Sequence, residues 1–336
     1  MQEILVEAKE LTKHFQSKGF FLKKNKAVRA VDGINFRIPK GETFGLVGES
    51  GCGKSTTARL LLRLLEPTAG CSFFRGHDIY KLKKKELQKL RREMQVIFQD
   101  PFSSLNMRMN VEEIVSEPLD IHKIGKKIER KKKVAELIEL VGLSPGDAKR
   151  FPHEFSGGQR QRIGIARALA LNPLFIVADE PVSSLDVSIR AQILNLMKDL
   201  QEKLGLTCLF IAHDLSNVKF LCDSVAVMYL GKIVEMGPKE SIFLDPRHPY
   251  TQTLLAAVTI PDPEIKRNRI ILSGEIPSPV NPPPGCRFHT RCPYATVRCK
   301  TMEPELRDTG NGHMVSCHLY LARDARNDQD TRNIIA

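Results

Sequence analysis

Eight consecutive residues near the N-terminus have the types and the spacing needed to bind nucleotide phosphates. The segment Gly48-Glu-Ser-Gly-Cys-Gly-Lys-Ser55 fits the pattern G-x-x-x-x-G-K-[ST]. Glycines let the backbone N–H groups of such a loop turn inward around phosphates, and a helix that follows adds its positive end. We expect Lys54 to reach the β- and γ-phosphates of a nucleotide and the Ser55 hydroxyl to ligate Mg²⁺. The predicted nucleotide contacts in this region are Gly48, Glu49, Ser50, Gly51, Cys52, Gly53, Lys54, Ser55 and Thr56.

Two adjacent carboxylates follow the phosphate loop in chain order. The apolar run Leu174–Ala178 ends directly at Asp179 and Glu180. An acidic residue at a strand end beside a phosphate loop can hold the magnesium shell, and we assign this role to Asp179. Glu180 is then the candidate general base that polarises the attacking water. An apolar run that ends in two acidic residues is a weak signal alone, but after a phosphate loop it indicates nucleotide hydrolysis.

The residues around these motifs indicate a fold in which strands and helices alternate. Several short apolar runs are continuous, which is typical of strands buried on both faces of a largely parallel sheet. These runs are Thr43–Val47, Gln95–Phe98, Leu174–Ala178, Thr207–Ile211 and Ser224–Tyr229. The helical patterns that follow most of them are Lys54–Leu65, Gln159–Leu171, Ser188–Leu204 and Leu215–Leu221. Strand and helix in alternation predict an α/β fold with crossover helices on both faces of the sheet.

Two segments depart from this alternation. Between Asp100 and Phe155 no convincing strand pattern appears, and helical patterns such as Ile128–Val141 dominate, so we expect a helical insertion. After about Gly237 we expect irregular chain. Within it Pro261–Gly285 should be an extended connector, because proline at this density resists both helix and sheet.

Composition and charge exclude some classes of protein. No apolar run is long enough to span a bilayer, and the N-terminus lacks the apolar core of a signal peptide, so we expect a soluble, cytoplasmic protein. The formal net charge is +12, with much of the excess in Lys81–Lys89 and Lys126–Lys133. These runs are typical of solvated helix faces, and a weak attraction to an anionic membrane surface is the alternative. Without Trp or interleaved aromatics, nucleic-acid binding is disfavoured.

A third motif makes a family resemblance specific. Between the phosphate loop and the Asp-Glu pair lies Phe155-Ser-Gly-Gly-Gln-Arg-Gln-Arg162. Gln99, Ser184-Leu-Asp186 and His213 complete a set of six motifs in one order along the chain. In this order the motifs resemble those of ATP-binding-cassette ATPases over about residues 1–245. The resemblance implies a P-loop NTPase core with a mostly parallel sheet, an antiparallel β subdomain and a helical insertion.

The resemblance also implies roles for residues of the other motifs. A helix that opens at Ser156-Gly157-Gly158-Gln159 offers free N–H groups, and in this family it faces the γ-phosphate held by the opposite subunit. Asp186 would then lie at the dimer seam and His213 would contact the γ-phosphate. Gln99 would link magnesium and the attacking water to the helical insertion, so that Ser55, Gln99 and Asp179 surround the metal. Phe15 is the best match for an aromatic ring that stacks on adenine, and a plain packing role is its alternative.

Longer stretches resemble the ATPases of oligopeptide and dipeptide importers, most closely the second of the two paired ATPases. They are Gln95–Asn106, Phe151–Ala170, His248–Leu254 and the C-terminal segment that contains four cysteines. The resemblance implies an ATPase that energises peptide uptake as a heterodimer with a related ATPase. Its partners would be two membrane permeases and an external binding protein, at the cytoplasmic face of the membrane. Alternatives are the same role for a substrate such as a nickel chelate, a soluble non-transport cassette ATPase, and a nucleotide-sensing subunit, which an intact Glu180 disfavours.

The cysteines near the C-terminus suggest a metal site. Cys286, Cys292, Cys299 and Cys317 lie close together in sequence, and in a reducing compartment such a group favours metal over disulfides. A [4Fe–4S] cluster tolerates these spacings, whereas zinc favours the shorter knuckles that are missing here. Zinc is the second choice, and a site without metal remains an alternative.

The motifs and the segments together predict two parts of the chain. We expect a cassette over residues 1–245, with its helical part at about 100–157, and an extension over residues 246–336.

Overall fold

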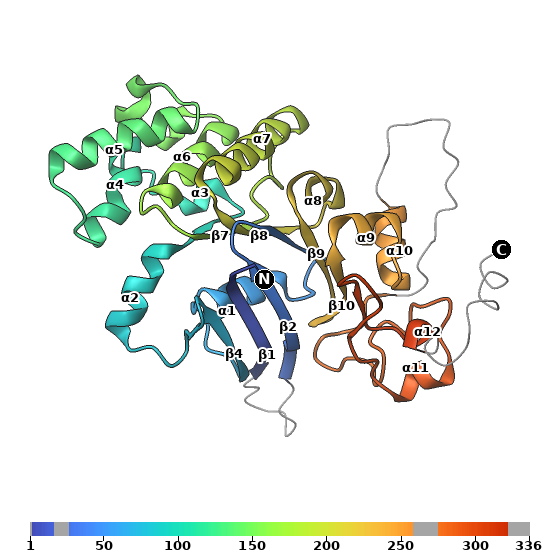
Figure 1. Ribbon diagram of the computed structural model, residues 1–336. Coiled ribbons are helices and arrows are strands. Elements are labelled where there is room, and N and C mark those ends of the chain that lie inside the picture. Colours follow the sequence, from blue (N-terminus) through green and yellow to red (C-terminus); the bar gives the residue numbers. More distant parts are fainter. Residues whose placement is uncertain (1, 17–26, 258–274, 322–336) are drawn as a thin grey trace, which may run out of the picture.

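A computed structural model describes residues 2–16, 27–257 and 275–321 of the chain (Figure 1). Its larger sheet is eight-stranded and crosses the middle of the molecule. In spatial order its strands are β11 (Arg307–Asp308), β12 (Met314–Val315), β10 (Lys232–Pro238), β9 (Ser224–Tyr229), β3 (Thr43–Val47), β8 (Thr207–Ala212), β7 (Phe175–Asp179) and β6 (Met94–Ile97). The strands from β9 to β6 are parallel, whereas β10, β12 and β11 pair in antiparallel fashion beyond β9.

The predicted α/β fold with a mostly parallel sheet is confirmed. Each of the five apolar runs forms a strand, and β3 and β9 begin and end at the predicted residues. Every residue of β3 and of β8 is buried. Helices cover one face of the sheet and a second sheet lies against the other, so these strands have no solvent-facing side that would require polar residues.

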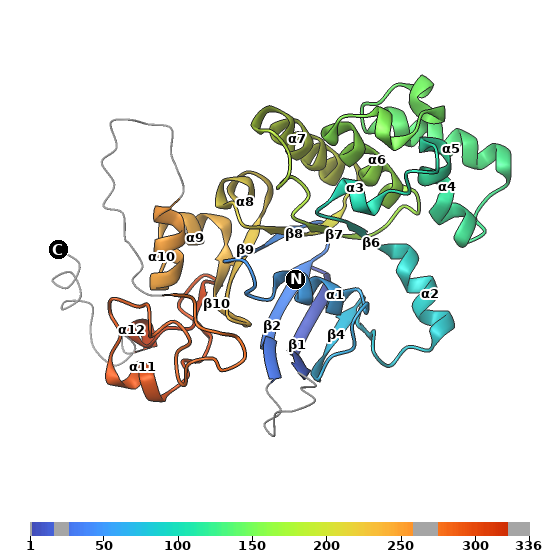
Figure 2. The ribbon, with the colours of Figure 1, turned by 180° about the vertical axis from the view of Figure 1, so that it is seen from behind.

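The second sheet contains the antiparallel strands expected from the family resemblance. Its order is β2 (Ala27–Pro39), β1 (Ile4–Gln16), β4 (Ala69–Phe74) and β5 (His77–Asp78). Apolar residues of this sheet share one hydrophobic cluster with the larger sheet and with α1 (Lys54–Leu61). Figure 2 shows α1 near both sheets, directly after the phosphate loop. The loop is therefore fixed between two rigid layers.

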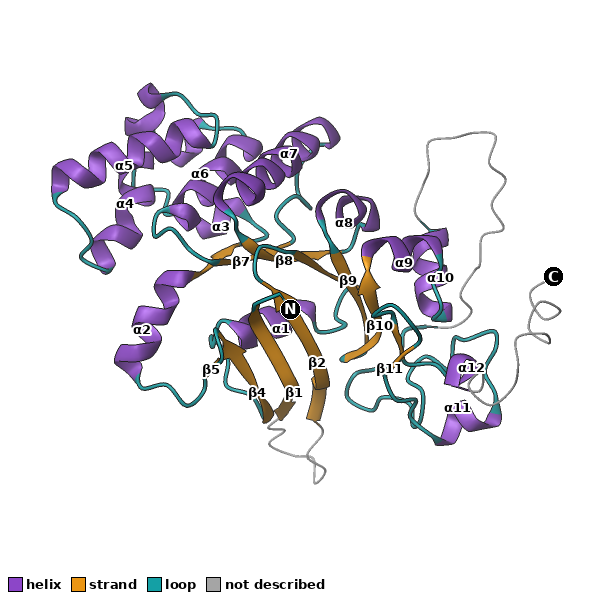
Figure 3. Ribbon diagram, in the orientation of Figure 1, coloured by secondary structure: helices purple, strands orange, loops and turns teal. Residues whose placement is uncertain are grey.

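Helices form a layer above the larger sheet (Figure 3). They are α3 (Pro101–Ser104), α4 (Val111–Ile121), α5 (Lys127–Leu140), the short 3-10 helices η1 (Pro145–Lys149) and η2 (Pro152–Glu154), α6 (Gly157–Leu169), α7 (Val187–Leu204) and α8 (Leu215–Leu221). No strand interrupts the described residues from 100 to 155, so the predicted helical insertion is confirmed. A further helix, α2 (Lys84–Glu93), lies beside β6.

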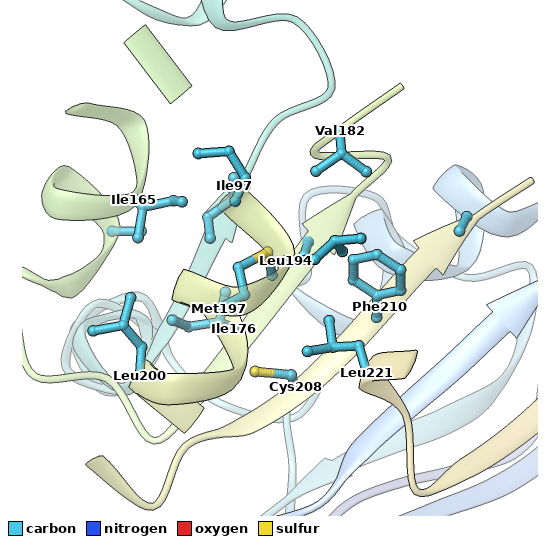
Figure 4. Close-up of a cluster of buried hydrophobic side chains, with 14 of the residues drawn as sticks. Ile97, Ile165, Ile176, Val182, Leu194, Met197, Leu200, Cys208, Phe210 and Leu221 are labelled. Carbon is cyan, nitrogen blue, oxygen red and sulfur yellow. The ribbon is translucent and has the colours of Figure 1, made fainter. Parts of the chain in front are cut away.

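Apolar side chains attach this helical layer to the sheet (Figure 4). Ile165 of α6 and Met197 of α7 belong to the same buried cluster as Ile176 and Phe210 of the sheet. Leu194 and Leu200 extend the α7 contribution at helical spacing. Each Å² of apolar surface removed from water stabilises the folded state by about 25 cal/mol. A cluster of this size therefore contributes strongly to the stability of the fold.

The chain after residue 237 is more regular than we expected. It forms α9 (Lys239–Leu244) and α10 (Pro249–Ala256), and later α11 (Val297–Thr301) and α12 (His318–Leu321). Its strands β12 and β11 extend the larger sheet beyond β10. The expectation of irregular chain after about Gly237 was wrong for these segments, because short helices and two-residue strands leave little periodic signal in the sequence. Of the predicted connector, residues 261–274 lie outside the described residues, and 275–285 form neither helix nor strand.

The two basic runs lie largely on α2 and α5, which have many exposed residues. This agrees with the expectation of solvated helix faces. None of the described helices has both the length and the apolar character needed to cross a membrane.

Candidate functional site

The carboxyl ends of four adjacent parallel strands bring the predicted residues to one edge of the sheet. The phosphate loop follows β3, His213 follows β8, and Asp179 ends β7. Gln99 lies two residues beyond β6, which pairs with β7. In open α/β sheets this edge is where ligands bind. Motifs separated by more than a hundred residues in the chain thus meet at one place.

The phosphate loop has a backbone that only glycine can supply at two positions. Gly48 has φ +150° and Gly53 has φ +114°. A Cβ atom at Gly48 would lie 2.1 Å from the Met228 carbonyl oxygen, and one at Gly53 would lie 2.1 Å from the Ala30 carbonyl oxygen. Side chains at these positions would therefore displace the loop from β9 and β2.

Inside the loop, the Lys54 side chain is buried at 5% exposure. Its Nζ donates to the carbonyl oxygens of Gly48 at 2.8 Å and of Glu49 at 3.1 Å. Ser50 and Gly51 are exposed at the tip, and Cys52 is buried beneath it. Burial raises the pKa of the Cys52 thiol, so this side chain is neutral. Thr56 lies in the first turn of α1, next to Ser55.

Ser55 and Asp179 meet as a magnesium site requires. The Ser55 hydroxyl donates to Asp179 Oδ1 at 3.0 Å. Burial raises the pKa of Asp179, and the neighbouring Glu180 charge raises it further, while the Ser55 hydrogen bond opposes them. A divalent cation between a hydroxyl and a buried carboxylate would relieve this unfavourable burial of charge.

Glu180 is the centre of a second group at this edge. Its Oε2 accepts a hydrogen bond from Gln99 Nε2 at 2.9 Å and lies 3.4 Å from His213 Nδ1. Its φ of +48° lies in the left-handed region, which costs a residue with a side chain about 1–3 kcal/mol. Strained backbone of this kind is found at active sites, and here it occurs at the residue that Gln99 and His213 contact.

The Ser156 turn is built as a helix N-terminus. Ser156 caps α6: its Oγ accepts from the Gln159 N–H at 3.3 Å, and Gln159 Oε1 accepts from the Ser156 N–H at 3.0 Å. A Cβ atom at Gly158 would lie 2.3 Å from Ile189 Cγ2, so glycine permits close packing against α7. Leu185 packs beside Gly157, and Asp186 precedes α7 as an exposed residue. Because Ser156 is exposed, this helix N-terminus is accessible from outside the chain.

Phe15 lies near the end of β1, opposite Val28 of β2. Its ring is 39% exposed and lies 5.3 Å from Lys13 Nζ. Among the described residues, no hydrogen bond or ring contact joins Phe15 to the phosphate loop. The adenine assignment stays a prediction.

The four C-terminal cysteines are free thiols in one small region. The Cys286 N–H donates to the Cys299 carbonyl oxygen at 2.9 Å. The pKa of Cys286 is raised to about 11 and that of Cys317 to about 12. Burial is the main cause, and the negative charges of neighbouring cysteines raise both pKa values further. Burial also raises the pKa of Cys292. Within the described residues, however, no group of three or more His, Cys, Asp or Glu side chains is arranged to hold a metal ion.

Two contacts of the phosphate loop were not predicted. The Glu49 carboxylate pairs with Arg291, and the Glu49 N–H donates to the hydroxyl of Tyr250 at 2.9 Å. Tyr250 lies in the stretch His248–Leu254, which indicates only the family resemblance, and Arg291 carries no signal, because a contact across 242 residues has no local pattern.

Comparisons with known proteins agree with this geometry. A family model described as "ABC transporter" matches residues 31–183, and one described as "Oligopeptide/dipeptide transporter, C-terminal region" matches residues 234–299. The chain is 53% identical to the putative oligopeptide transport ATP-binding protein YkfD of Bacillus subtilis (strain 168), over 98% of both chains. It is also 53% identical to the oligopeptide transport ATP-binding protein AppF of that organism, over 95% of this chain and 98% of AppF.

The fold resembles solved structures of the same kind. A dimeric structure of an ATP-binding cassette in a post-hydrolysis state, bound to ADP and Pi, matches with a TM-score of 0.62 at 30% identity. The match covers 70% of this chain and 99% of the chain in that solved structure. The chain belongs to the ABC transporter ATPases, in the group that carries the oligopeptide/dipeptide transporter C-terminal region.

Proposed function

We propose that this chain is the ATP-hydrolysing subunit that energises a membrane importer of dipeptides and oligopeptides. The observation that carries the proposal is a match at 53% identity over almost the whole chain to ATP-binding proteins named for oligopeptide transport. The match includes the C-terminal region as well as the cassette. Both of these relatives are named for oligopeptide transport, which favours peptides over the alternative of nickel chelates.

We propose the following roles at the nucleotide site. Lys54 and the loop N–H groups bind the β- and γ-phosphates, and Ser55, Gln99 and Asp179 surround magnesium. The Ser55–Asp179 hydrogen bond supports the magnesium assignment. Glu180 acts as general base, supported by its contact with Gln99 and its strained backbone.

Three further assignments place residues around the rest of the nucleotide. His213 contacts the γ-phosphate, supported by its position 3.4 Å from Glu180. Phe15 stacks on adenine, supported by the exposure of its ring. The Ser156-Gly157-Gly158-Gln159 turn faces the γ-phosphate bound by a partner cassette, with Asp186 at the seam between them. Support comes from the exposed helix end and from the dimeric cassette that this fold resembles.

The proposed assembly contains a homologous second ATPase, two membrane permeases and, indirectly, an extracellular binding protein. This chain would be the second type of ATP-binding subunit in a heterodimer, attached to the cytoplasmic face of the membrane as a peripheral protein. The C-terminal region named for oligopeptide and dipeptide transporters supports this assembly. We further propose a division into a cassette at 1–245, with its helical part at about 100–157, and an extension at 246–336.

Purification from membranes tests the proposal. We expect the chain to co-purify with two permeases and a related ATPase. After reconstitution into vesicles, a peptide-loaded binding protein should stimulate ATP hydrolysis and peptide uptake. A Lys54→Ala chain in the same assembly is the control and should abolish both. Stimulation by a nickel chelate but not by peptides would select the alternative substrate, and isolation without any permease would contradict a transport role.

We also propose that the extension holds a [4Fe–4S] cluster, with zinc as the second choice. Support comes from the four free thiols, two buried and two half-buried, that lie in one small region of the extension. Cys286, Cys292, Cys299 and Cys317 would hold the group. The cluster would contribute folding energy to an extension whose helices and strands are short, and the proposed hydrolysis does not depend on redox chemistry.

Elemental analysis after anaerobic purification tests this site. We expect iron and visible absorption in the wild-type chain, and loss of both in Cys299→Ser and Cys317→Ser chains. Cys71→Ser, which changes a half-buried thiol in β4, is the matched control and should keep its iron. Zinc in place of iron would select the second choice, and a colourless protein without either metal would refute a metal site.

A further inference from the structure

Glu49 of the phosphate loop is held from outside by the C-terminal region. Arg291 Nη1 and Nη2 donate to Glu49 Oε2 and Oε1 at 2.8 and 3.1 Å, which forms a two-pronged ion pair. The side chain of Arg291 is 8% exposed and that of Glu49 is 23% exposed. A bidentate pair sheltered from water fixes orientation as well as distance, unlike an exposed pair.

A second contact reaches the backbone of the same residue. The Glu49 N–H donates to the Tyr250 hydroxyl at 2.9 Å, and the side chain of Tyr250 is fully buried. While the tyrosine hydroxyl stays in position, this hydrogen bond restrains rotation of the peptide group that joins Gly48 to Glu49. The orientation of the first peptide group in the loop is therefore set by α10.

The opposite side of Glu49 faces the interior of the loop. Its carbonyl oxygen accepts from Lys54 Nζ at 3.1 Å and from the Cys52 N–H at 3.3 Å. Glu49 is thus joined to Lys54 on its inner side, and to Tyr250 and Arg291 on its outer side. A shift of Glu49 would move the peptide groups that surround the lysine amine.

The two outer residues are themselves fixed by packing. Tyr229 at the end of β9 lies 4.7 Å from Tyr250 and 5.3 Å from Phe288, ring centre to ring centre. Tyr250 and Phe288 are also in contact, at 5.4 Å. Phe288 precedes Arg291 by three residues and is 1% exposed. Such an aromatic cluster keeps both contacts with Glu49 in place, because each ring blocks movement of the others.

We propose that Tyr250 and Arg291 are positioning residues for ATP binding, which hold the phosphate loop in its binding shape through Glu49. The affinity of the cassette for ATP then depends on a region that lies outside the cassette motifs. This inference rests on the proposed function, because it takes the loop around Lys54 as the ATP site. Neither residue is assigned a contact with the nucleotide, and each acts through Glu49.

A double-mutant cycle in the full chain tests the ion pair. Glu49→Gln and Arg291→Met should each weaken binding of a fluorescent ATP analogue with Mg²⁺ by about three- to tenfold. Because both changes break one contact, the double variant should lose no more than either single one. Arg291→Lys, which keeps the charge but not the two-pronged geometry, should fall between wild type and Arg291→Met. Arg307→Met removes an exposed pair with Glu305 in the same region and should leave ATP affinity unchanged.

The backbone contact needs its own variant. Tyr250→Phe removes only the hydroxyl and should weaken ATP binding by about threefold or more, because the Glu49 N–H loses its acceptor. Tyr80→Phe is the matched control: its hydroxyl donates to the Leu60 carbonyl at 2.8 Å, away from Glu49. Thermal unfolding without nucleotide separates this effect from a general loss of stability. A variant that is only less stable has a lower melting temperature but keeps the ATP affinity of the folded protein.

Two results separate failure of this inference from failure of the proposed function. Wild-type ATP affinity in Glu49→Gln, Arg291→Met and Tyr250→Phe would overturn the positioning role while leaving the ATP site intact. Wild-type affinity in Lys54→Ala would instead contradict the ATP site itself. Additive losses in the double variant would also overturn the coupling, since independent effects cannot come from one shared contact.

Discussion

A Glu180→Gln chain should bind ATP normally and lose hydrolysis by about a hundred- to ten-thousandfold, the usual contribution of a general base. The amide has the shape of the carboxylate and can still accept the hydrogen bond that Gln99 Nε2 donates. It cannot take a proton from the attacking water at neutral pH. Because the backbone of Glu180 keeps its left-handed conformation, the site should remain assembled around Ser55 and Asp179.

Hydrolysis and association should separate in this variant. In the assembled transporter, ATP hydrolysis is measured by phosphate release, and ATP-dependent association of the paired cassettes is measured by size. The variant should accumulate as an ATP-bound pair, since the bound nucleotide is not consumed. Glu305→Gln, an exposed glutamate in the extension, serves as the control and should behave as wild type. Normal turnover in Glu180→Gln would remove Glu180 as the base.

The central strands and most of the site could be predicted because their signals are local. Strands β3 and β9 are continuous apolar runs, and both their ends were predicted. The phosphate loop and the Asp179-Glu180 pair follow such runs directly. Since the ends of parallel strands share one edge, motif order was enough to predict that Ser55 and Asp179 would meet.

The remaining elements carry weaker local signals. Strand β1 mixes buried and exposed residues with register shifts, so its sequence lacks a clean alternation, and it was not predicted by its residues alone. Strand β12 spans only Met314–Val315 and depends on pairing with β10, about eighty residues earlier. Such a short segment forms a strand because a partner edge is available, which periodicity cannot show.

The same limit applies to the site. Lys54, Asp179 and Glu180 lie in motifs whose residue types imply chemistry, whereas Arg291 is one basic residue among many. Its role depends on Phe288 packing against Tyr229, which brings the extension against the loop. Tertiary packing therefore decides which charged residues act on the phosphate loop.

A Ser156→Asp chain should lose hydrolysis at its partner's nucleotide site by about a hundredfold or more, while binding its own ATP normally. Aspartate is as good a helix N-cap as serine, so α6 keeps a side-chain acceptor for the Gln159 N–H. A carboxylate at this helix end would, however, repel a γ-phosphate presented by the opposite cassette. Two like charges about 4 Å apart at a partly exposed interface repel each other by about 4 kcal/mol. A hundredfold loss of rate corresponds to only about 2.7 kcal/mol, so the repulsion is large enough to cause it.

A second N-cap serine provides the matched control. Ser144 caps the short helix η1 with its Oγ accepting from the Gly146 N–H, in the same helical part of the chain. Ser144→Asp introduces the same charge without facing a nucleotide and should leave hydrolysis unchanged. ATP affinity is measured on each chain alone, and hydrolysis is measured on the assembled pair. If Ser156→Asp instead abolished ATP binding by its own chain, Ser156 would belong to the site formed by Lys54, and the head-to-tail arrangement of two cassettes would be wrong.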